Sequence, residues 1–395
     1  MAGQFDTIII GAGAAGLMCA ATAGALGRRV VLLDHNREAG AKILISGGGR
    51  CNFTNEHTVP ERFLGANPRF CRSALSRYTP QDFISLVQKH GIAYHEKSLG
   101  QLFCDGSARQ IVAMLMAECA AGGVVTAFGA RVTDVSRGMG YRVATETGVF
   151  EAPTLVLATG GMSIPKLGAT GFAHEVAGRF GLSLTPIRPG LVPLTFDGGQ
   201  LDLMRPLSGV TLPVRARAGK VAFEEALLFT HRGLSGPAVL QASSYLERGA
   251  SVLVDLLPGA DAALALLDGK RRRPRAELRT VLAELLPQRL AAALAARLPD
   301  RIMAEQTDRD LRGLAVTLNG WRLEPTGTEG YAKAEVTLGG IDTAALSSRT
   351  MEARAVPGLF AIGEAVDVTG WLGGYNFQWA WASGWCAGMA IAEVS

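Results

Sequence analysis

The stretch FDTIIIGAGAAGLMCAATAGALGRRVVLLD, residues 5–34, decides the fold of this 395-residue chain. An apolar run over residues 5–10 predicts a buried strand, the turn GAGAAG follows it, and an uncharged run after the turn predicts a helix. A second apolar strand ends on Asp34, whose carboxylate can accept hydrogen bonds from the hydroxyls of an adenosine ribose. Together these elements are typical of a βαβ unit that binds a dinucleotide, the alternative being a glycine-rich turn without a ligand.

The glycines of this turn meet three separate steric demands. Gly11 permits the tight turn, Gly13 lets the backbone approach a pyrophosphate, and Gly16 lets the helix pack closely on the strand. Ala14 and Ala15 complete the turn and open the helix, whose free N–H groups and positive dipole end attract phosphate.

The composition is that of a well-packed α/β protein, with 48% hydrophobic and 19% charged residues. The length exceeds one ordinary core, so two or three structural units are expected. Residues 7–27 and 368–392 carry no charge, but glycines interrupt both stretches, and neither is interpreted as a membrane span. A cytoplasmic location without a membrane partner is therefore expected.

The six cysteines show no C-x-x-C spacing. This pattern argues against a zinc site, an iron–sulfur cluster and a redox-active dithiol, so no metal is expected. The net charge of +4 permits a polyanionic partner without requiring one.

Strands and helices alternate over residues 1–190, as a doubly wound sheet requires. Amphipathic helices are expected at 80–91 and 107–122, and a strand hairpin at 130–152. The buried run TLVLATGG, residues 154–161, returns the chain to the sheet and is expected to bring Thr159 and Gly160 beside the nucleotide.

The pattern changes at residue 191. Residues 191–260 contain short alternating strands, which predict a small antiparallel or barrel-like insert, and residues 261–325 are helical. Residues 326–395 then resume the first domain. The insert contains no second G-x-G-x-x-G, so a dedicated nicotinamide domain is not expected.

The C-terminal motif GEAVDVTGWLGGYNFQWA, residues 363–380, suggests a flavin site. Gly363 and Glu364 end a strand where an acid could lie near the ribityl chain or phosphates of FAD. A helix that begins near Gly374 would direct the amides of Asn376 and Phe377 at the flavin pyrimidine ring. The alternative is a buried glycine-rich helix without a ligand.

A second glycine-rich segment, KILISGGGRCNFTN, spans residues 42–55. Its successive glycines allow close approach of a phosphate or flavin, with two cationic side chains beside them. A plain turn is the alternative. The residues expected to contact the cofactor in this segment are Lys42, Gly47, Gly48, Gly49, Arg50 and Asn52.

These motifs, together with YHEKSLGQLFCD, LATGGMSIPKLGATG, LLFTHRGLSGPAVLQ and GTEGYAKAEVTLGG, resemble those of the BaiN/RdsA-type NAD(P)/FAD-dependent flavoproteins over essentially the whole chain. The resemblance implies a Rossmann-like domain that binds FAD non-covalently and is interrupted by a β-barrel-like and helical insert. It also implies that members reduce conjugated carbon–carbon double bonds with NAD(P)H, on steroid-like substrates or on a uridine of ribosomal RNA. The FAD-lining residues that it implies are Ala15, Asp34, Lys42, Gly47–Gly49, Val132, Glu364, Asn376 and Phe377.

Reduction of such a bond needs a hydride from the flavin on one carbon and a proton on its neighbour. Cys104 and Cys51 are the candidate proton donors, followed by Tyr331. A packed free thiol is the alternative for each cysteine.

A run of basic residues, KRRRPR, lies in the helical part of the insert. It could engage RNA phosphates, although a solvated loop is the preferred interpretation. Its cations are Lys270, Arg271, Arg272, Arg273 and Arg275.

The sequence thus predicts an FAD-dependent oxidoreductase that reduces a small-molecule substrate with transiently bound NAD(P)H. The alternatives are a reductase of uridine in ribosomal RNA and a flavin-carrying RNA-binding protein with little turnover.

Overall fold

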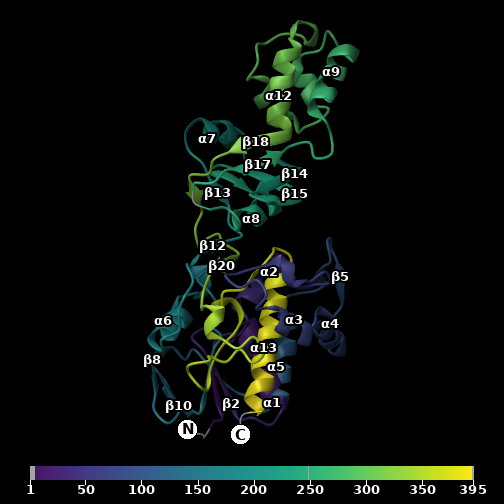
Figure 1. Cartoon of the computed structure of the whole chain (residues 1–395). Coiled ribbons are helices and arrows are strands. Elements are labelled where there is room, and N and C mark those ends of the chain that lie inside the picture. Colours follow the sequence, from purple (N-terminus) through teal and green to yellow (C-terminus); the bar gives the residue numbers. More distant parts are fainter. Residues whose placement is uncertain (1–4, 248, 394–395) are drawn as a thin grey trace. The chain divides into compact units, whose positions relative to one another are not determined.

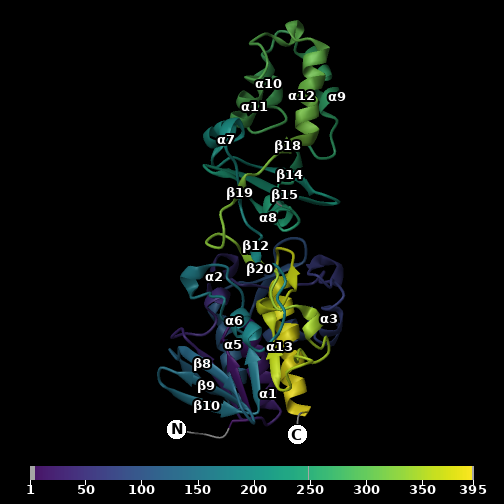
Figure 2. The ribbon, with the colours of Figure 1, turned by 60° about the vertical axis from the view of Figure 1, so that its left-hand side comes forward.

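The computed structural model describes residues 5–247 and 249–393. The chain divides into two compact units, one formed by residues 1–188 and 336–395, and the other by residues 189–335 (Figures 1 and 2). The first unit is discontinuous in sequence, as the resumption of its pattern near the C-terminus predicted. The expected boundary at residue 325 lies inside the second unit, because β19 (Gly327–Thr328) pairs with β13 (Leu194–Thr195).

A five-stranded parallel sheet forms the centre of the first unit, in the order β21-β11-β1-β2-β7. All four residues of β1 are buried between its neighbours, as the apolar run predicted. The α/β class with a parallel sheet is confirmed. The strands are β1 (Thr7–Ile10), β2 (Val30–Asp34), β7 (Val125–Phe128), β11 (Thr154–Leu157) and β21 (Leu359–Ala361).

The turn between β1 and α1 (Ala14–Ala25) depends on its glycines. Gly11 has φ +109°, and a Cβ there would lie 2.4 Å from the carbonyl oxygen of Ala158 on the neighbouring chain segment. A Cβ on Gly16 would lie 1.8 Å from the carbonyl oxygen of Gly11. The turn therefore tolerates no side chain at either position.

Helix α13 (Tyr375–Glu393) packs directly on α1, so the end of the first unit lies against its beginning (Figure 1). The contact is close because two of its residues lack a side chain. A Cβ on Gly384 would lie 2.5 Å from the carbonyl oxygen of Ala15, and one on Gly388 would lie 2.6 Å from Cβ of Thr22.

The two amphipathic helices expected in this unit are confirmed as α4 (Pro80–Lys89) and α5 (Arg109–Ala121). The predicted hairpin is a three-stranded antiparallel sheet, β10-β9-β8 (Figure 2). The other helices and strands of the unit are β8 (Val132–Arg137), β9 (Tyr141–Thr145), β10 (Gly148–Ala152), α2 (Ala41–Gly49), β3 (Asn52–Asn55), β4 (Phe63–Leu64), α3 (Arg72–Arg77), β5 (Tyr94–Glu96), β6 (Gln101–Cys104), α6 (Phe172–Arg179), β20 (Val336–Leu338) and β22 (Thr369–Gly370).

The second unit contains a seven-stranded sheet in the order β18-β17-β14-β15-β16-β13-β19, with antiparallel neighbours. Residues 324–326 alone join β18 to β19, although these strands form opposite edges. The sheet must therefore curl until its edges lie within about 14 Å, the reach of this connection. The strands not yet given bounds are β14 (Thr211–Ala218), β15 (Val221–Thr230), β16 (Gly233–Ser235), β17 (Val252–Asp255) and β18 (Trp321–Leu323).

The helical part of the insert belongs to the same unit as this sheet, with α12 packed on α9. Pro287 interrupts the long amphipathic segment, so that it forms two short helices. The helices of the unit are α7 (Gly198–Met204), α8 (Pro237–Ser243), α9 (Ala262–Arg272), α10 (Leu278–Leu282), α11 (Gln288–Ala295) and α12 (Asp308–Gly320).

Among the helices of the described residues, none combines the length and apolar character needed to cross a bilayer. The six cysteines are free thiols with buried side chains.

The α1–α13 contact predicts a steric effect on stability. Gly384→Ala should lower the free energy of unfolding by about 1–3 kcal/mol, because its methyl group would overlap the backbone of α1. Gly178→Ala in α6 is the matched control: no atom lies within 4 Å of its Cβ position, so the change should be neutral or stabilising by a few tenths of a kcal/mol. Urea unfolding of both variants measures the difference, and equal effects would contradict the role given to this contact.

Candidate flavin and substrate site

The N-terminus of α1 is open in the described part of the chain. Gly13 occupies the N-cap position without a side-chain cap, and no atom lies within 4 Å of its Cβ position. Asp34 fixes this end of the helix to β2, because its carboxylate accepts the N–H groups of Ala12 at 2.7 Å and Asn36 at 2.8 Å. The turn is thus held in place while the helix end can accept an anion.

Val132 lies near the same edge of the sheet as Asp34. The amide of Ala130, two residues before it, donates to the carbonyl oxygen of Asp34 at 2.9 Å, and Gly129 donates to Asn36 at 2.8 Å. Val132, which the resemblance implies lines the FAD, thus follows a segment that is hydrogen-bonded to Asp34, the residue expected at the adenosine ribose.

Thr159 and Gly160 follow β11 beside the glycine turn. Within the described residues, the buried hydroxyl of Thr159 has no hydrogen-bond partner, and no atom lies within 4 Å of the Cβ position of Gly160. Since a buried hydroxyl rarely lacks a partner, the arrangement fits a polar ligand at this point.

Lys42 and Glu364 form an ion pair at 2.6 Å that joins α2 to the segment after β21. Ser163 donates to the same carboxylate at 3.0 Å, and the amide of Thr337 donates at 2.9 Å. Burial favours a raised pKa for Glu364, but the charge of Lys42 and these hydrogen bonds outweigh it, so the pKa is lowered. The carboxylate is therefore ionised at neutral pH.

The C-terminal motif meets the first motif directly. A Cβ on Gly363 would lie 2.8 Å from Cβ of Ala15, and the carbonyl oxygen of Gly363 accepts the indole N–H of Trp379 at 3.0 Å. Glu364 is thus held beside the start of α1. This juxtaposition joins the two segments that the sequence assigned to one cofactor.

Helix α13 begins directly after Gly374, as predicted. The side chain of Asn376 accepts the N–H of Gly370 at 2.8 Å and donates to its carbonyl oxygen at 2.9 Å. That side chain therefore fixes the preceding loop, whereas Phe377 stacks on Trp381 with ring centroids 5.6 Å apart.

The glycine loop departs from helical geometry inside α2. Gly47 and Gly48 have φ +58° and +67°, and Cys51 has the left-handed φ of +52°, which is uncommon for a residue with a side chain. The buried carbonyl oxygen of the Asn52 side chain has no partner among the described residues, and its amide donates to Gln101 at 3.0 Å.

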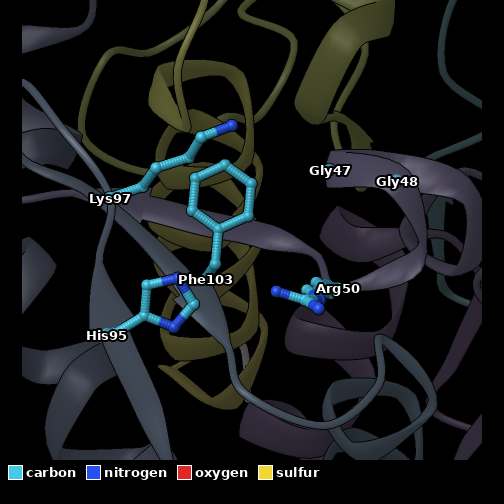
Figure 3. Close-up of a pocket in the computed structure, with 6 residues that line it drawn as sticks. All are labelled: Gly47, Gly48, Arg50, His95, Lys97 and Phe103. Carbon is cyan, nitrogen blue, oxygen red and sulfur yellow. The ribbon is translucent and has the colours of Figure 1, made fainter.

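A pocket of about 410 Å³ borders this loop (Figure 3). One side is formed by the loop and the other by the antiparallel strands β5 and β6. The lining residues are Gly47, Gly48, Arg50, His95, Lys97 and Phe103. His95, Lys97 and Phe103 were not singled out from the sequence, although they lie in one of the motifs that carry the family resemblance.

The candidate proton donors differ in accessibility. Cys51 and Cys104 expose none of their surface, and burial raises the pKa of Cys51 to about 12 and that of Cys104 to about 11. Because side chains alternate along β6 and Phe103 lines the pocket, Cys104 faces away from it. Tyr331 belongs to the second unit, and burial raises its pKa.

The basic run of the insert is partly neutralised by neighbouring carboxylates. Lys270 pairs with Asp308 at 2.8 Å, Arg271 and Arg272 pair with Asp268, and Arg273 pairs with Glu284. For Arg275 no carboxylate partner occurs within the described residues. Because Asp268 serves two arginines and Arg275 has no such partner, the carboxylates offset only part of the positive charge of the run.

The residues of the first unit fit FAD. The open N-terminus of α1, the unpartnered hydroxyl of Thr159 and the unpartnered side-chain oxygen of Asn52 lie along the motifs that the sequence assigned to the nucleotide and the flavin. Bound FAD supplies hydride chemistry at its isoalloxazine ring.

Comparison with known proteins identifies the family of the chain. Residues 5–390 match the family described as HI0933-like protein Rossmann domain. The chain is 52% identical to the ribosomal RNA dihydrouridine synthase of Escherichia coli (strain K12), over 99% of both chains, and 29% identical to the 3-dehydro-bile acid delta(4,6)-reductase of Clostridium scindens, over 98% of both.

Among solved structures, the 3-ketosteroid-delta4-(5alpha)-dehydrogenase of Rhodococcus jostii RHA1 has a TM-score of 0.52 and 15% identity, covering 98% of this chain and 97% of that one. At this identity the likeness concerns the fold alone. The family match and the relatives together confirm the flavoprotein interpretation. The chain therefore belongs to the HI0933-like family of Rossmann-domain flavoproteins and is an FAD-dependent oxidoreductase.

Proposed function

We propose that this protein reduces a uridine of ribosomal RNA to dihydrouridine, using FAD as its cofactor and NAD(P)H as its electron donor. The observation that carries the proposal is the 52% identity, over 99% of both chains, to the E. coli ribosomal RNA dihydrouridine synthase. The sequence-based interpretation placed a small-molecule substrate first and ribosomal RNA second. The similarity to that enzyme favours the second of these substrates.

The chemistry of the pocket supports an RNA substrate. Its lining includes the cationic groups of Arg50 and Lys97 and the imidazole of His95, beside the ring of Phe103. Cationic groups at a concave site favour an anionic substrate, as a nucleotide of RNA is.

For the cofactor, the proposal assigns the adenosine to the edge near Asp34 and Val132, and the pyrophosphate to the start of α1. The flavin then follows the glycine loop toward the start of α13, where Phe377 lies. NAD(P)H docks transiently, because the sequence holds no second G-x-G-x-x-G for a resident nicotinamide.

Saturation of the uracil C5=C6 bond requires a proton in addition to the hydride that FAD supplies. His95 is the proposed donor in place of Cys104, because it lines the pocket while Cys104 faces the opposite side of β6. The Nδ1 atom of His95 lies 2.6 Å from a carboxylate oxygen of Asp105, which orients the ring. Cys51 and Tyr331 remain predicted as alternative proton donors.

The proposed reaction can be tested directly. Purified FAD-loaded protein with NADPH or NADH should form dihydrouridine in ribosomal RNA isolated from cells that lack the protein, as measured by mass spectrometry of RNA digests. Reactions without a nicotinamide are the control. Reduction of a small enone without any dihydrouridine would favour the small-molecule alternative, and tight RNA binding without turnover would favour an RNA-binding flavoprotein.

The role of His95 predicts a selective kinetic defect. His95→Gln should slow reoxidation of the reduced flavin by RNA by about 10²-fold or more, because a positioned acid is lost, while reduction by NAD(P)H proceeds. Stopped-flow absorbance separates the two half-reactions. Cys104→Ser is the comparison variant: if it, rather than His95→Gln, loses the oxidative half-reaction, Cys104 is the donor.

The Lys42–Glu364 pair predicts a pH-dependent effect on stability. Lys42→Met should lower the free energy of unfolding at pH 7 by roughly 1–3 kcal/mol, because the Glu364 carboxylate loses its counter-charge. Since folding lowers the pKa of Glu364, its contribution is present at neutral pH and is lost as the pH falls through that pKa.

The difference in the free energy of unfolding between wild type and Lys42→Met should therefore become smaller as the pH falls toward about 3. Urea unfolding across this range measures it. Lys166→Met, at an exposed lysine of the same unit, controls for loss of a positive charge. A difference that does not change with pH would contradict the assignment.

A further inference from the structure

Two cations at the pocket have no carboxylate partner. Some cations of the first unit, such as Lys42 and Lys89, form ion pairs with acidic side chains, and others, such as Arg69 and Lys166, do not within the described residues. Within the described part of the chain, no ion pair involves Arg50 or Lys97, and both side chains are exposed at the pocket (Figure 3). Cationic groups left unneutralised on two sides of a concave site favour an anionic ligand.

Two acidic side chains lie near the pocket, and neither contacts its two cations. Glu96, the last residue of β5, follows His95 and so points to the opposite face of that strand, where it accepts the amide of Gly100 at 2.8 Å. Asp105 lies 2.6 Å from His95. Arg50 and Lys97 therefore stay available to an anionic ligand.

Packing holds these groups in position. The ammonium of Lys97 lies 5.5 Å from the centroid of the Phe103 ring, and the His95 ring stacks on the same residue at 6.2 Å. Phe103 is only 8% exposed, and a Cβ on Gly47 would lie 2.7 Å from its ring. The ring on which Lys97 and His95 lie is therefore packed tightly against the glycine loop. A cation held over a buried ring loses little conformational freedom when it binds an anion.

The volume limits the size of the ligand. About 410 Å³ lies within the range of pockets for single small molecules and is too small for a duplex. A nucleotide turned out of an RNA strand combines a base that must reach the active site with phosphates on either side of it. Arg binds a phosphate in a bidentate manner, and Lys binds it as a point charge.

We propose that this pocket binds the RNA phosphodiester that flanks the reacting uridine, with Lys97 and Arg50 as its phosphate ligands, which moves Arg50 from the cofactor, where the sequence had assigned it, to the substrate. The inference rests on the proposed reduction of ribosomal RNA. It assigns the recognition of the RNA backbone to the glycine loop and the β5–β6 strands, rather than to the basic run at residues 270–275, in which four of the five cations form ion pairs. The uridine would then enter beside the loop that is proposed to contact the flavin.

Lys97→Gln tests the assignment, with Lys89→Gln as the matched control because Glu118 already neutralises Lys89. The probe is a fluorescein-labelled RNA hairpin with a uridine in its loop, and fluorescence anisotropy at several salt concentrations gives Kd. Lys97→Gln should raise Kd on the order of tenfold at low salt. It should also reduce the slope of log Kd against log salt by about 0.7, the value for one phosphate contact on single-stranded RNA.

Lys97→Arg should retain the slope, because it keeps the positive charge. An unchanged slope in Lys97→Gln, or an equal change in Lys89→Gln, would overturn the assignment. Loss of FAD from purified Lys97→Gln would overturn it as well, since the pocket would then serve the cofactor.

The outcomes separate the two proposals. If wild type forms dihydrouridine and Lys97→Gln has an unchanged salt slope, the proposal that the pocket binds phosphate is rejected. The proposed reduction of uridine then still stands. A reduced slope without dihydrouridine formation by wild type supports phosphate binding in the pocket and rejects the reaction.

Discussion

The first unit depends on the close packing of α13 on α1, which requires glycine at the points where the two helices come nearest. Glycines at 384 and 388 let the last helix approach the backbone of the first, and Gly363 meets Ala15 at the same junction. Dispersion and burial along this contact hold together two segments that are more than 300 residues apart in sequence. The Glu364 carboxylate reaches Lys42 and Ser163 because this contact fixes the segment that carries it.

The site is built on a rigid sheet and completed by loops. The parallel strands present their carboxyl ends, from which Asp34, Thr159 and Glu364 follow, at one edge. The glycine loop and the β5–β6 strands add a charged wall beside them. The backbone geometry at the strand ends suits a cofactor that stays bound. Exposed cations suit a substrate that binds and is then released.

Much of the first unit follows from local sequence. Glycines, caps and periodicity are local signals in the sequence. They predicted the β1–α1–β2 unit, helices α4 and α5 and the start of α13. The pairing of Lys42 with Glu364 and the partial neutralisation of the basic run were not predicted, because they depend on long-range contacts. The same holds for the pocket: His95 on β5 and Lys97 directly after it are close in sequence, but only the pairing of β5 with β6 shows that they meet the glycine loop and that Cys104 points away.

The insertion of one unit into another also sets an order of events during synthesis. Strand β21 and helix α13 follow the whole of residues 189–335, so the parallel sheet lacks an edge strand, and α1 its partner helix, until those last elements leave the ribosome. The inserted unit has its own sheet and helices and can fold in that interval. Throughout it the face of α1 that α13 covers stays exposed, so the nascent first unit is prone to aggregation until synthesis reaches α13.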